Sequence, residues 1–357
     1  MENMVINKSF WSGKKVFITG DTGFKGTWLS LWLVKLGANV IGFSLEEENR
    51  KSFISEEVDY ENYKGDIRDY EFLKKIIYLT KPEIIIHLAA QPIVQKSYTD
   101  PIETYSTNIM GTVNLLEIAR ECKSVVSLLN VTTDKCYENK EWHWGYREYE
   151  PMGGHDPYSC SKGCSELISS SYRRSFFDEN NKRLATARAG NVIGGGDWAE
   201  NRIVPDAVRA FIGNEKLLIR NPMAIRPWQH VLDPIAGYIL LSQKLFESKE
   251  YAEAWNFGPN NEDAKPVSIV ANILVKYWGG NASWSLDNNK YPHEANYLKL
   301  DCSKSISKLG WKPVWNLSQA LHQCVDWYKA WNNNSNITNF SINQIDIYTN
   351  DLIKNYE

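Results

Sequence analysis

KKVFITGDTGFKGTWLSLWLVKLG, residues 14–37, joins a short β-rich run to a longer helical pattern through a turn with three glycines. The turn, GDTGFKG at residues 20–26, has the spacing G-x-x-G-x-x-G and opens directly into the helix. Glycines at these positions let the turn be tight, let the backbone approach a pyrophosphate and let helix and strand pack closely. The N–H groups at the helix start would then meet the phosphate charge. Alone, the pattern also suits an ordinary strand-turn-helix, but as the first unit of an alternating series it favours a dinucleotide site.

The alternation of strand and helix continues along the first half of the chain. Short apolar runs are separated by helical patterns, which argues for parallel strands joined by crossover helices. The runs are apolar throughout, as expected where helices cover both faces of a sheet. We predict strands in KKVFIT, NVIGF, EIIIHLAA, SVVSLLNVTT and RLATARAG, and helices at about residues 24–37, 69–80, 101–122 and 156–179.

The regular alternation of strands and helices ends at about Asn191, and the predicted elements beyond it are shorter. We therefore predict an α/β protein with a Rossmann-type doubly wound parallel sheet over residues 10–190 and a smaller C-terminal α/β substrate-binding lobe over residues 191–335. The two are interleaved, because the patterns LDPIAGYILLSQKLF and AWNFGP, within about residues 228–258, look like a helix and a strand that return to the main sheet. Residues 336–357 are predicted to be a C-terminal tail with a short, weak helical pattern.

Composition places the chain among ordinary globular proteins. Hydrophobic residues make up 43% and charged residues 23% of its 357 residues, so disordered and fibrous classes are poor fits. The formal net charge of -3, without a basic block, gives no general attraction for nucleic acid or anionic lipid. No window approaches the roughly 18 apolar residues that a membrane helix needs. The six cysteines show no disulfide-type array and no metal-ligand cluster, so we expect a cytoplasmic protein without a metal.

The end of the second strand bears on which dinucleotide binds. An acidic residue there normally holds the adenosine ribose, but the strand ends in GFSL at residues 42–45, and the acids at residues 46–48 come slightly late. No Arg or Lys stands there to meet a 2′-phosphate, so NAD is favoured over NADP. Asp66, in KGDIRD after the third strand, is expected either to contact adenine together with Ile67 or to cap the following helix.

A tyrosine and a lysine form the second chemical pattern. Tyr158 and Lys162 lie four residues apart and therefore on one face of a predicted helix. In isolation such a pair is usually solvated, but here the preceding strand ends in NVTTD at residues 130–134, at the edge where a doubly wound sheet gathers its ligands. The lysine and a positive nicotinamide would draw the tyrosine pKa down from about 10. The phenolate could then take a hydroxyl proton as hydride leaves the same carbon.

These motifs together resemble a known superfamily. The glycine turn, HLAAQ at residues 87–91 and the Tyr158-x-x-x-Lys162 pair are similar to those of extended short-chain dehydrogenases/reductases. More narrowly, GFKGTWLSLWL, TDKCYENKEWHWGYRE, DPYSCSKGCSEL, RAGNVIGGGDW and IRPWQHVLDP resemble the CDP-glucose 4,6-dehydratase family block for block. The likeness spans roughly residues 10–331. The superfamily motifs are shared with epimerases and reductases, whereas the segment at residues 133–148 is much more specific.

The resemblance implies a three-stage reaction in which NAD is regenerated within each turnover. Tyr158 takes the proton from the sugar 4-hydroxyl, which Thr133 orients, while hydride passes from carbon 4 to NAD. The resulting 4-ketone acidifies the proton on carbon 5. Lys135 removes that proton, Asp134 protonates the departing 6-hydroxyl, and the hydride returns to carbon 6. As a base Lys135 must be neutral, which requires a pKa below the usual value of about 10.4.

The resemblance also implies binding residues, a substrate and an assembly. CDP-glucose would be the substrate and CDP-4-dehydro-6-deoxy-glucose the product, within deoxysugar biosynthesis such as that of lipopolysaccharide O-antigen. A homodimer or homotetramer is expected. The substrate-binding residues implied are Asn191, Arg202, Arg226 and His293, of which the arginines suit a diphosphate. The cofactor-binding residues implied are Gly20, Thr22, Gly23, Phe24, Lys25, Gly26, Asp66, Ile67, Ala89, Ala90, Gln91, Asn108, Tyr158 and Lys162.

Asp21 departs from the family pattern, in which histidine is common at that place in the glycine turn. An acid beside a pyrophosphate is electrostatically awkward. We therefore expect either that Lys25 offsets its charge or that Asp21 points away and caps the following helix.

Other functions remain open on the sequence. A nucleotide-sugar 4-epimerase would need Tyr158, Lys162 and NAD but no acid and base at carbon 6, so the pair Asp134-Lys135 argues against it. In dTDP-sugar dehydratases the corresponding pair is Asp-Glu, so Asp-Lys favours CDP-glucose over another nucleotide sugar. A binding or regulatory protein without turnover would need none of these four side chains.

Overall fold

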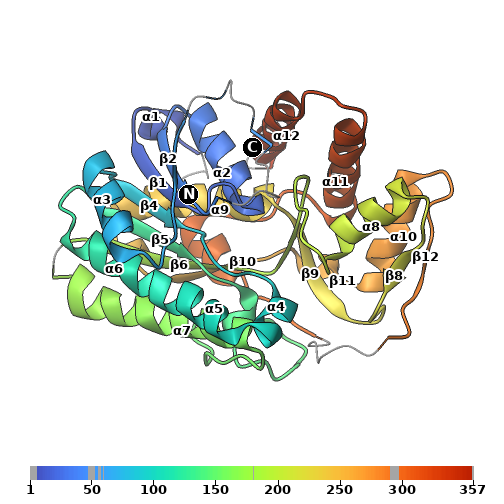
Figure 1. The fold of residues 1–357 in the computed structure, drawn as a ribbon, viewed down its shortest axis with the longest axis horizontal. Coiled ribbons are helices and arrows are strands. Elements are labelled where there is room, and N and C mark those ends of the chain that lie inside the picture. The colour runs from blue at the N-terminus through green and yellow to red at the C-terminus, as the bar shows by residue number, and fades with distance from the viewer. Residues whose placement is uncertain are drawn as a thin grey trace.

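The computed structural model describes residues 6–46, 53–54, 58, 60–179, 181–289 and 297–355. At its centre is a seven-stranded parallel sheet with the order β10-β6-β5-β4-β1-β2-β3 (Figure 1). The chain winds outward from β1 to β3 and then crosses back to build β4, β5, β6 and β10 on the other side. This topology confirms the predicted doubly wound fold. The strands are β1 Lys15–Thr19, β2 Asn39–Ser44, β3 Glu61–Lys64, β4 Ile84–His87, β5 Ser127–Val131, β6 Arg183–Ala189 and β10 Ala254–Phe257.

Helices cover both faces of this sheet and create two cores. Successive residues of a strand point to opposite faces, so Phe17 lies in one core while Val16 and Ile18 lie in the other. The core around Phe17 is closed by α3 (Tyr70–Thr80), α6 (Gly111–Glu121) and α7 (Pro157–Tyr172). The opposite core is closed by α2 (Phe24–Lys35) and α9 (Leu232–Glu247). Apolar residues on both faces explain the continuous apolar runs of the sequence.

Two π-helical turns interrupt helices that the sequence pattern predicts as continuous. The predicted helix at residues 101–122 consists of α5 (Pro101–Tyr105), a π turn at Ser106–Met110 and α6. The predicted helix at residues 156–179 consists of α7 followed by a π turn at Arg173–Phe177. Such turns add one residue to the helical repeat and are frequent at functional sites.

The smaller lobe lies beside the carboxyl edge of the sheet (Figure 1). It contains a three-stranded sheet, β11-β9-β7, and a two-stranded pair, β12-β8. The chain leaves it to form α9 and β10, and β10 pairs with β6, so the lobes are interleaved. The elements of this lobe are β7 Asn191–Ile193, α8 Ile203–Ile212, β8 Leu217–Ile219, β9 Ile225–His230, β11 Ala264–Pro266, α10 Val267–Trp278 and β12 Trp284–Leu286.

The C-terminal segment is more ordered than the sequence pattern indicates. Following α11 (Leu317–Asn332), the predicted tail folds as α12 (Ile337–Lys354), an 18-residue helix. It packs on α2 through an edge-to-face contact of Tyr348 with Trp32, with ring centroids 5.6 Å apart. The helical pattern is weak in sequence because polar residues such as Ser341 and Gln344 are buried together with the apolar ones.

Asp233, in the first turn of α9, ties this C-terminal region to the large domain. Its Oδ1 accepts hydrogen bonds from the backbone N–H of Val314 (2.7 Å) and from the hydroxyl of Tyr348 (2.8 Å). Burial raises the pKa of Asp233 to about 7 from 3.8. The folded protein therefore binds this proton more tightly than the unfolded chain does, and stability is lost as the pH rises from about 4 through about 7.

We therefore expect Asp233→Asn to reduce the loss of stability between pH 5 and pH 8. The amide keeps an acceptor for Val314 and removes a group whose ionisation costs up to about 1.4 kcal/mol for each pH unit in this window. Urea midpoints of both proteins at the two pH values measure the effect. Asp178→Asn, at an exposed position, is the matched control. If the urea midpoints of Asp233→Asn and the parent fell equally between pH 5 and pH 8, Asp233 would not be the group that causes this loss of stability.

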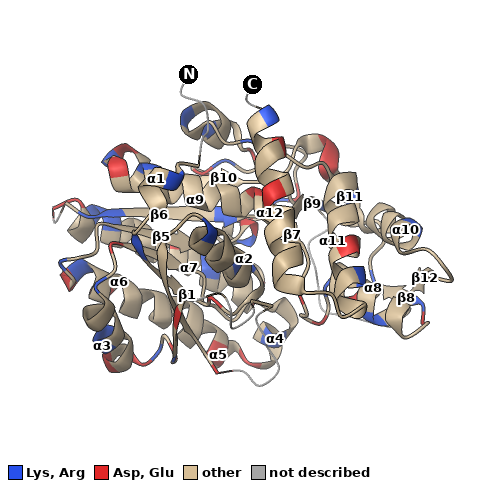
Figure 2. Cartoon of the chain, turned by 90° about the horizontal axis from the view of Figure 1, so that it is seen from above, with Lys and Arg blue, Asp and Glu red and all other residues tan. Residues whose placement is uncertain are grey.

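Charges of both signs are mixed over the molecule. Figure 2 shows basic and acidic residues side by side along helices such as α3, without a continuous basic face over the described elements. Within the residues that the structure describes, no helix is long and apolar enough to span a bilayer.

Candidate active site

The glycine turn between β1 and α2 forms a backbone cradle. Gly20 has a φ of +74°, and a Cβ there would lie 2.8 Å from the backbone nitrogen of Ala89. A Cβ on Gly26 would lie 2.0 Å from the carbonyl oxygen of Gly20. No side chain of the described residues caps α2 at Gly23, so the N–H groups of its first turn are available to an anion. The turn therefore fits the pyrophosphate of a dinucleotide.

Asp21 lies beneath this cradle and its side chain points away from it, as one of the two expectations stated, but the expected capping of α2 and the expected pairing with Lys25 are both wrong. Its side chain is fully buried and accepts hydrogen bonds from the Tyr60 hydroxyl (3.0 Å) and from the Asn62 amide. Burial raises the pKa of the carboxyl, against the opposing effect of these donors. Because the side chain is directed at β2 and β3, it neither caps α2 nor pairs with Lys25. The sequence could not reveal this, since Tyr60 and Asn62 are some forty residues away along the chain.

The loop after β4 is fixed by buried polar side chains. Thr19 Oγ1 lies 2.6 Å from Nδ1 of His87 and accepts from the backbone N–H of Ala89 (3.2 Å). Asn108, in the first π turn, accepts from the backbone N–H of Gln91 (2.8 Å) and donates to the Ser161 hydroxyl (2.9 Å). Gln91 and Asn108 therefore hold the loop against α7. Their direct contact with a cofactor stays a prediction, as does that of Ala89 and Ala90.

Asp66 and Ile67 lie at the carboxyl end of β3. Asp66 binds the Arg68 guanidinium and backbone N–H, and although burial acts to raise its pKa, Arg68 lowers it below the usual value. The cap of α3 is Asp69, which accepts from the Phe72 N–H, so the alternative of a capping role for Asp66 is wrong. Ile67 is buried against Gly111, where a Cβ would lie 2.4 Å from the Ile67 side chain. Contact of these residues with adenine remains a prediction.

Asp134 and Lys135 begin a short 3₁₀ turn, Asp134–Cys136, shortly after β5, and Thr133 is the N-cap of this turn. The Thr133 hydroxyl donates to Asp134 Oδ1 (3.0 Å), and the Lys135 ammonium lies 4.0 Å from the same oxygen. Asp134 is 1% exposed, and among the described residues its Oδ2 has no hydrogen-bond partner. Lys135 is 34% exposed. A buried carboxylate oxygen without a partner normally costs stability, which is the arrangement expected of a group that awaits a ligand.

Tyr158 and Lys162 face this turn from α7. Both are buried, Tyr158 is hydrogen-bonded to Thr133, and the Lys162 ammonium lies 3.4 Å from the carbonyl oxygen of Val131. A tyrosine pKa lowered by Lys162 and a bound nicotinamide together stays a prediction. Burial raises the pKa of Tyr158 to about 12, against the lowering effects of Thr133 and Arg202. Burial likewise lowers the pKa of Lys162 to about 8.

Cationic side chains gather around Asp134. Burial and the charges of Arg202 and Lys162 lower the pKa of Lys25 to about 7, while Asp134 acts in the opposite direction. Arg202 is held by a salt bridge of 2.9 Å to Asp197. Asp197 was not among the predicted site residues, although it lies only five residues from Arg202. The cluster gives the site the positive potential that a diphosphate requires.

Only some of the predicted substrate-binding residues lie close to Asp134. Asn191 begins β7, and within the described structure its Oδ1 is buried without a hydrogen-bond partner. Its neighbour Gly190 packs on Asp134, because a Cβ there would lie 3.0 Å from Oδ2 of that carboxylate. Arg226 lies in β9, opposite Lys265 of β11. His293 lies outside the described residues.

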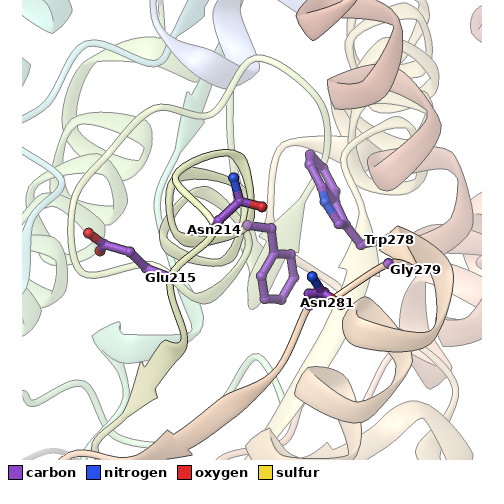
Figure 3. A pocket seen from close by; sticks show the side chains of 8 residues that line it. Asn214, Glu215, Trp278, Gly279 and Asn281 are labelled. Carbon is purple, nitrogen blue, oxygen red and sulfur yellow. The ribbon is translucent and has the colours of Figure 1, made fainter.

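A pocket of about 180 Å³ lies elsewhere, at the far end of the small lobe (Figure 3). Trp278, Asn214 and Glu215 are among the residues that line it, and the predicted site residues are not. Within the described part of the chain, no group of three or more His, Cys, Asp or Glu side chains could hold a metal ion. The carboxyl edge of the main sheet therefore remains the candidate active site.

The chain resembles known sugar-nucleotide enzymes over most of its length. The sequence profile described as GDP-mannose 4,6 dehydratase matches residues 17–324. The CDP-glucose 4,6-dehydratase of Salmonella typhimurium is 54% identical over 336 residues, which cover 92% of this chain and 94% of that protein.

Two solved structures share the fold. The dTDP-glucose 4,6-dehydratase from Bacillus anthracis in complex with NAD has a TM-score of 0.76 and 21% identity, covering 91% of this chain and 100% of that one. An epimerase from Methanothermobacter thermautotrophicus has a TM-score of 0.80 and 23% identity, covering 92% and 96%. Because a dehydratase and an epimerase match similarly, the fold does not distinguish the two activities.

Proposed function

The chain belongs to the GDP-mannose 4,6-dehydratase family, and on that premise we propose that it is an NAD-dependent CDP-glucose 4,6-dehydratase. It would convert CDP-glucose into CDP-4-dehydro-6-deoxy-glucose and water. The observation that carries the proposal is the buried Asp134 with its unpartnered oxygen, next to Lys135 and across from Tyr158. An epimerase would have no use for this acid and base. The 54% identity to a CDP-glucose 4,6-dehydratase supports the same substrate.

The position of each site residue suggests its role in the proposed reaction. Tyr158, oriented by its hydrogen bond to Thr133, would take the proton of the sugar 4-hydroxyl. Lys135 would remove the proton from carbon 5 and return it to that carbon when carbon 6 receives hydride, and Asp134 would donate a proton to the departing 6-hydroxyl. Arg202 and Asn191 would hold the diphosphate end, with Arg226 as a further contact. Asp134 must receive a proton before each elimination, and the Thr133 hydroxyl at 3.0 Å offers a connection toward Tyr158.

NAD fits the cradle made by Gly20, Gly23 and Gly26, in which an added Cβ would clash at Gly20 and Gly26. When bound, it would accept hydride from carbon 4 and return it to carbon 6. The pKa of Tyr158 must fall from about 12 for the tyrosine to act as a base near neutral pH. The positive charges of Lys162, Arg202 and a nicotinamide ring act in that direction.

The experiment is an incubation of the purified protein and NAD with CDP-, dTDP-, UDP- and GDP-glucose separately. Mass spectrometry then detects loss of water. Loss from CDP-glucose alone supports both the reaction and the base specificity. Loss from another nucleotide sugar would overturn the base specificity, and an isomer of unchanged mass would favour the 4-epimerase.

We also propose a homodimer that forms through α5 and α7. Three large apolar side chains are exposed here: Ile102 of α5 (81%), Met110 of the π turn that follows α5 (51%) and Leu167 of α7 (59%). An exposed apolar surface of this kind often marks an interface. Ile102→Glu combined with Leu167→Glu is expected to give monomers in light scattering, whereas Leu79→Glu, on α3, is expected to leave the dimer intact. A dimer that persists in the double variant would contradict this interface. A tetramer of the parent protein would contradict the proposed dimeric state.

We propose a cytoplasmic location and a place in deoxysugar biosynthesis, such as that of O-antigen. All six cysteines are free thiols, as in proteins of reducing compartments. The 4-keto-6-deoxy product is chemically suited to a following reductase, epimerase or aminotransferase.

A further inference from the structure

Glu166 lies on α7, one helical turn after Lys162 and two turns after Tyr158. The spacing of four residues places all three on one face of the helix. Glu166 is 4% exposed, and the proposed reaction makes no use of it. A buried carboxylate so close to the catalytic face requires compensation, because removal of a charge from water is costly.

The compensation comes from two strands of the main sheet. Glu166 accepts hydrogen bonds from the hydroxyls of Thr132 and Thr186 (2.8 Å), and it forms a salt bridge of 2.7 Å with Arg188. Burial acts to raise the pKa of Glu166, but Arg188 and the two hydroxyls outweigh burial and hold it below the usual value. The side chain is therefore an anion that joins α7 to the ends of β5 and β6.

The contacts continue from Arg188 to the loop that follows the turn of Thr133, Asp134 and Lys135 (the catalytic turn). Arg188 donates to the hydroxyl of Tyr137 (2.8 Å) and to the carbonyl oxygen of Glu148 (3.0 Å). Tyr137 in turn donates to Asn256 of β10 (2.7 Å). Thr132 and Tyr137 flank the turn of Thr133, Asp134 and Lys135. Both ends of that turn are thus anchored to one buried ion pair.

We propose that Glu166 is a positioning residue for the dehydratase reaction, which holds the Tyr158 and Lys162 face of α7 in register with the catalytic turn and keeps a negative charge beside Lys162. The inference rests on the proposed function. Burial lowers the pKa of Lys162 to about 8; Glu166 is the principal group that opposes this, and Cys136 is a smaller one. Among the described residues, the other titratable groups that interact with the charge of Lys162 are Lys25 of α2 and His87 of β4. Without Glu166, Lys162 would lose its proton at a lower pH, and Tyr158 would lose the cation that favours its phenolate.

The test must separate the charge of Glu166 from its structural contacts. Glu166→Gln alone leaves Arg188 as an unpaired buried charge, which can prevent folding. The double variant Glu166→Gln/Arg188→Gln removes both charges and keeps side chains that can hydrogen-bond. Thr186→Val is the matched control, because it removes one hydrogen bond to Glu166 and leaves the carboxylate charged.

We expect the alkaline limb of the kcat profile to move down by about one pH unit in the double variant. The fall in kcat should be about threefold at pH 7.5 and approach tenfold near pH 9, while KM for CDP-glucose changes less than about twofold at either pH. Thr186→Val should lower the urea midpoint and leave the alkaline limb in place. An unmoved limb in a folded double variant would overturn the proposal, as would an equal displacement in Thr186→Val.

A measurement that needs no turnover distinguishes a failure of this proposal from a failure of the proposed dehydratase function. Lysine labelled with ¹³C at the ε carbon reports the protonation of Lys162 by NMR, with Lys162→Arg to assign the signal. Titration at lower pH in the double variant than in the parent supports the inference even if no sugar nucleotide is consumed. Identical titration in both would refute it. An inactive parent protein would instead count against the dehydratase assignment.

Chemical rescue gives a second line of evidence. Glu166 and Arg188 border a pocket of about 280 Å³, whose other charged lining residues are Glu148, Glu150, Glu253, Arg173 and Lys304, and formate is small enough to enter a pocket of this volume. Formate added to Glu166→Ala should restore part of kcat and should not do so for Lys162→Ala. No recovery in a folded Glu166→Ala protein, at formate concentrations that leave the parent unaffected, would count against a role of the charge.

Discussion

Tyr158→Phe is expected to lower kcat for CDP-glucose by about 10³-fold, because the acceptor of the 4-hydroxyl proton is lost. The ring fills the same buried space, so the fold should persist. NAD affinity should change less than about threefold, since we expect the backbone cradle at Gly20 and Gly26, and not the Tyr158 hydroxyl, to hold the cofactor. Steady-state kinetics and calorimetric titration with NAD measure the two quantities.

The matched control is Tyr149→Phe, which removes the same atom from a side chain that is 82% exposed. It should keep parental kcat. Near-parental turnover in Tyr158→Phe would remove Tyr158 from the reaction. Loss of NAD binding together with turnover would mean that the hydroxyl supports the cofactor and not the proton transfer.

Lys135→Ala is expected to separate oxidation at carbon 4 from elimination. Tyr158 and Asp134 remain in place, so hydride transfer from carbon 4 can still occur, but the base for carbon 5 is gone. Water loss should fall by about 10²-fold or more. Reduced nicotinamide should then accumulate on the enzyme after CDP-glucose is added, which its near-ultraviolet absorbance records in a rapid-mixing experiment.

Lys140→Ala serves as the control, because Lys140 lies in the same loop, is 60% exposed and pairs with Glu138. The Lys140→Ala variant should release water from CDP-glucose at the parental rate and should not accumulate reduced cofactor. If Lys135→Ala released water as fast as the parent, the base would have to be sought elsewhere, and Lys25, with a pKa near 7, would be the next candidate.

The features that could be predicted from sequence are those encoded by neighbouring residues. The glycine turn, the alternation that gives the parallel sheet and the Tyr158 and Lys162 face of α7 each depend on spacing within one element. The succession of Thr133, Asp134 and Lys135 at the end of β5 is of the same kind. For these, local chain geometry already determines which side chains lie together.

The features that could not be predicted depend on contacts between distant segments. Asp21 finds Tyr60 and Asn62 across three strands, and Glu166 pairs with Arg188 only once β6 lies beside β5. The raised pKa of Tyr158 reflects burial by the folded lobes. The spacing of Glu166 after Lys162 was the one available signal, but on sequence alone it cannot be distinguished from an ordinary helical ion pair.

CDP-glucose deuterated at carbon 4 tests whether one active site oxidises carbon 4 and returns the same hydride to carbon 6 after loss of water. The labelled substrate is incubated with unlabelled NAD, and the product is examined by NMR and mass spectrometry. We expect a product lighter by one water that carries the deuterium at carbon 6. A product of unchanged mass with deuterium still at carbon 4, or deuterium recovered in free reduced cofactor, would contradict it.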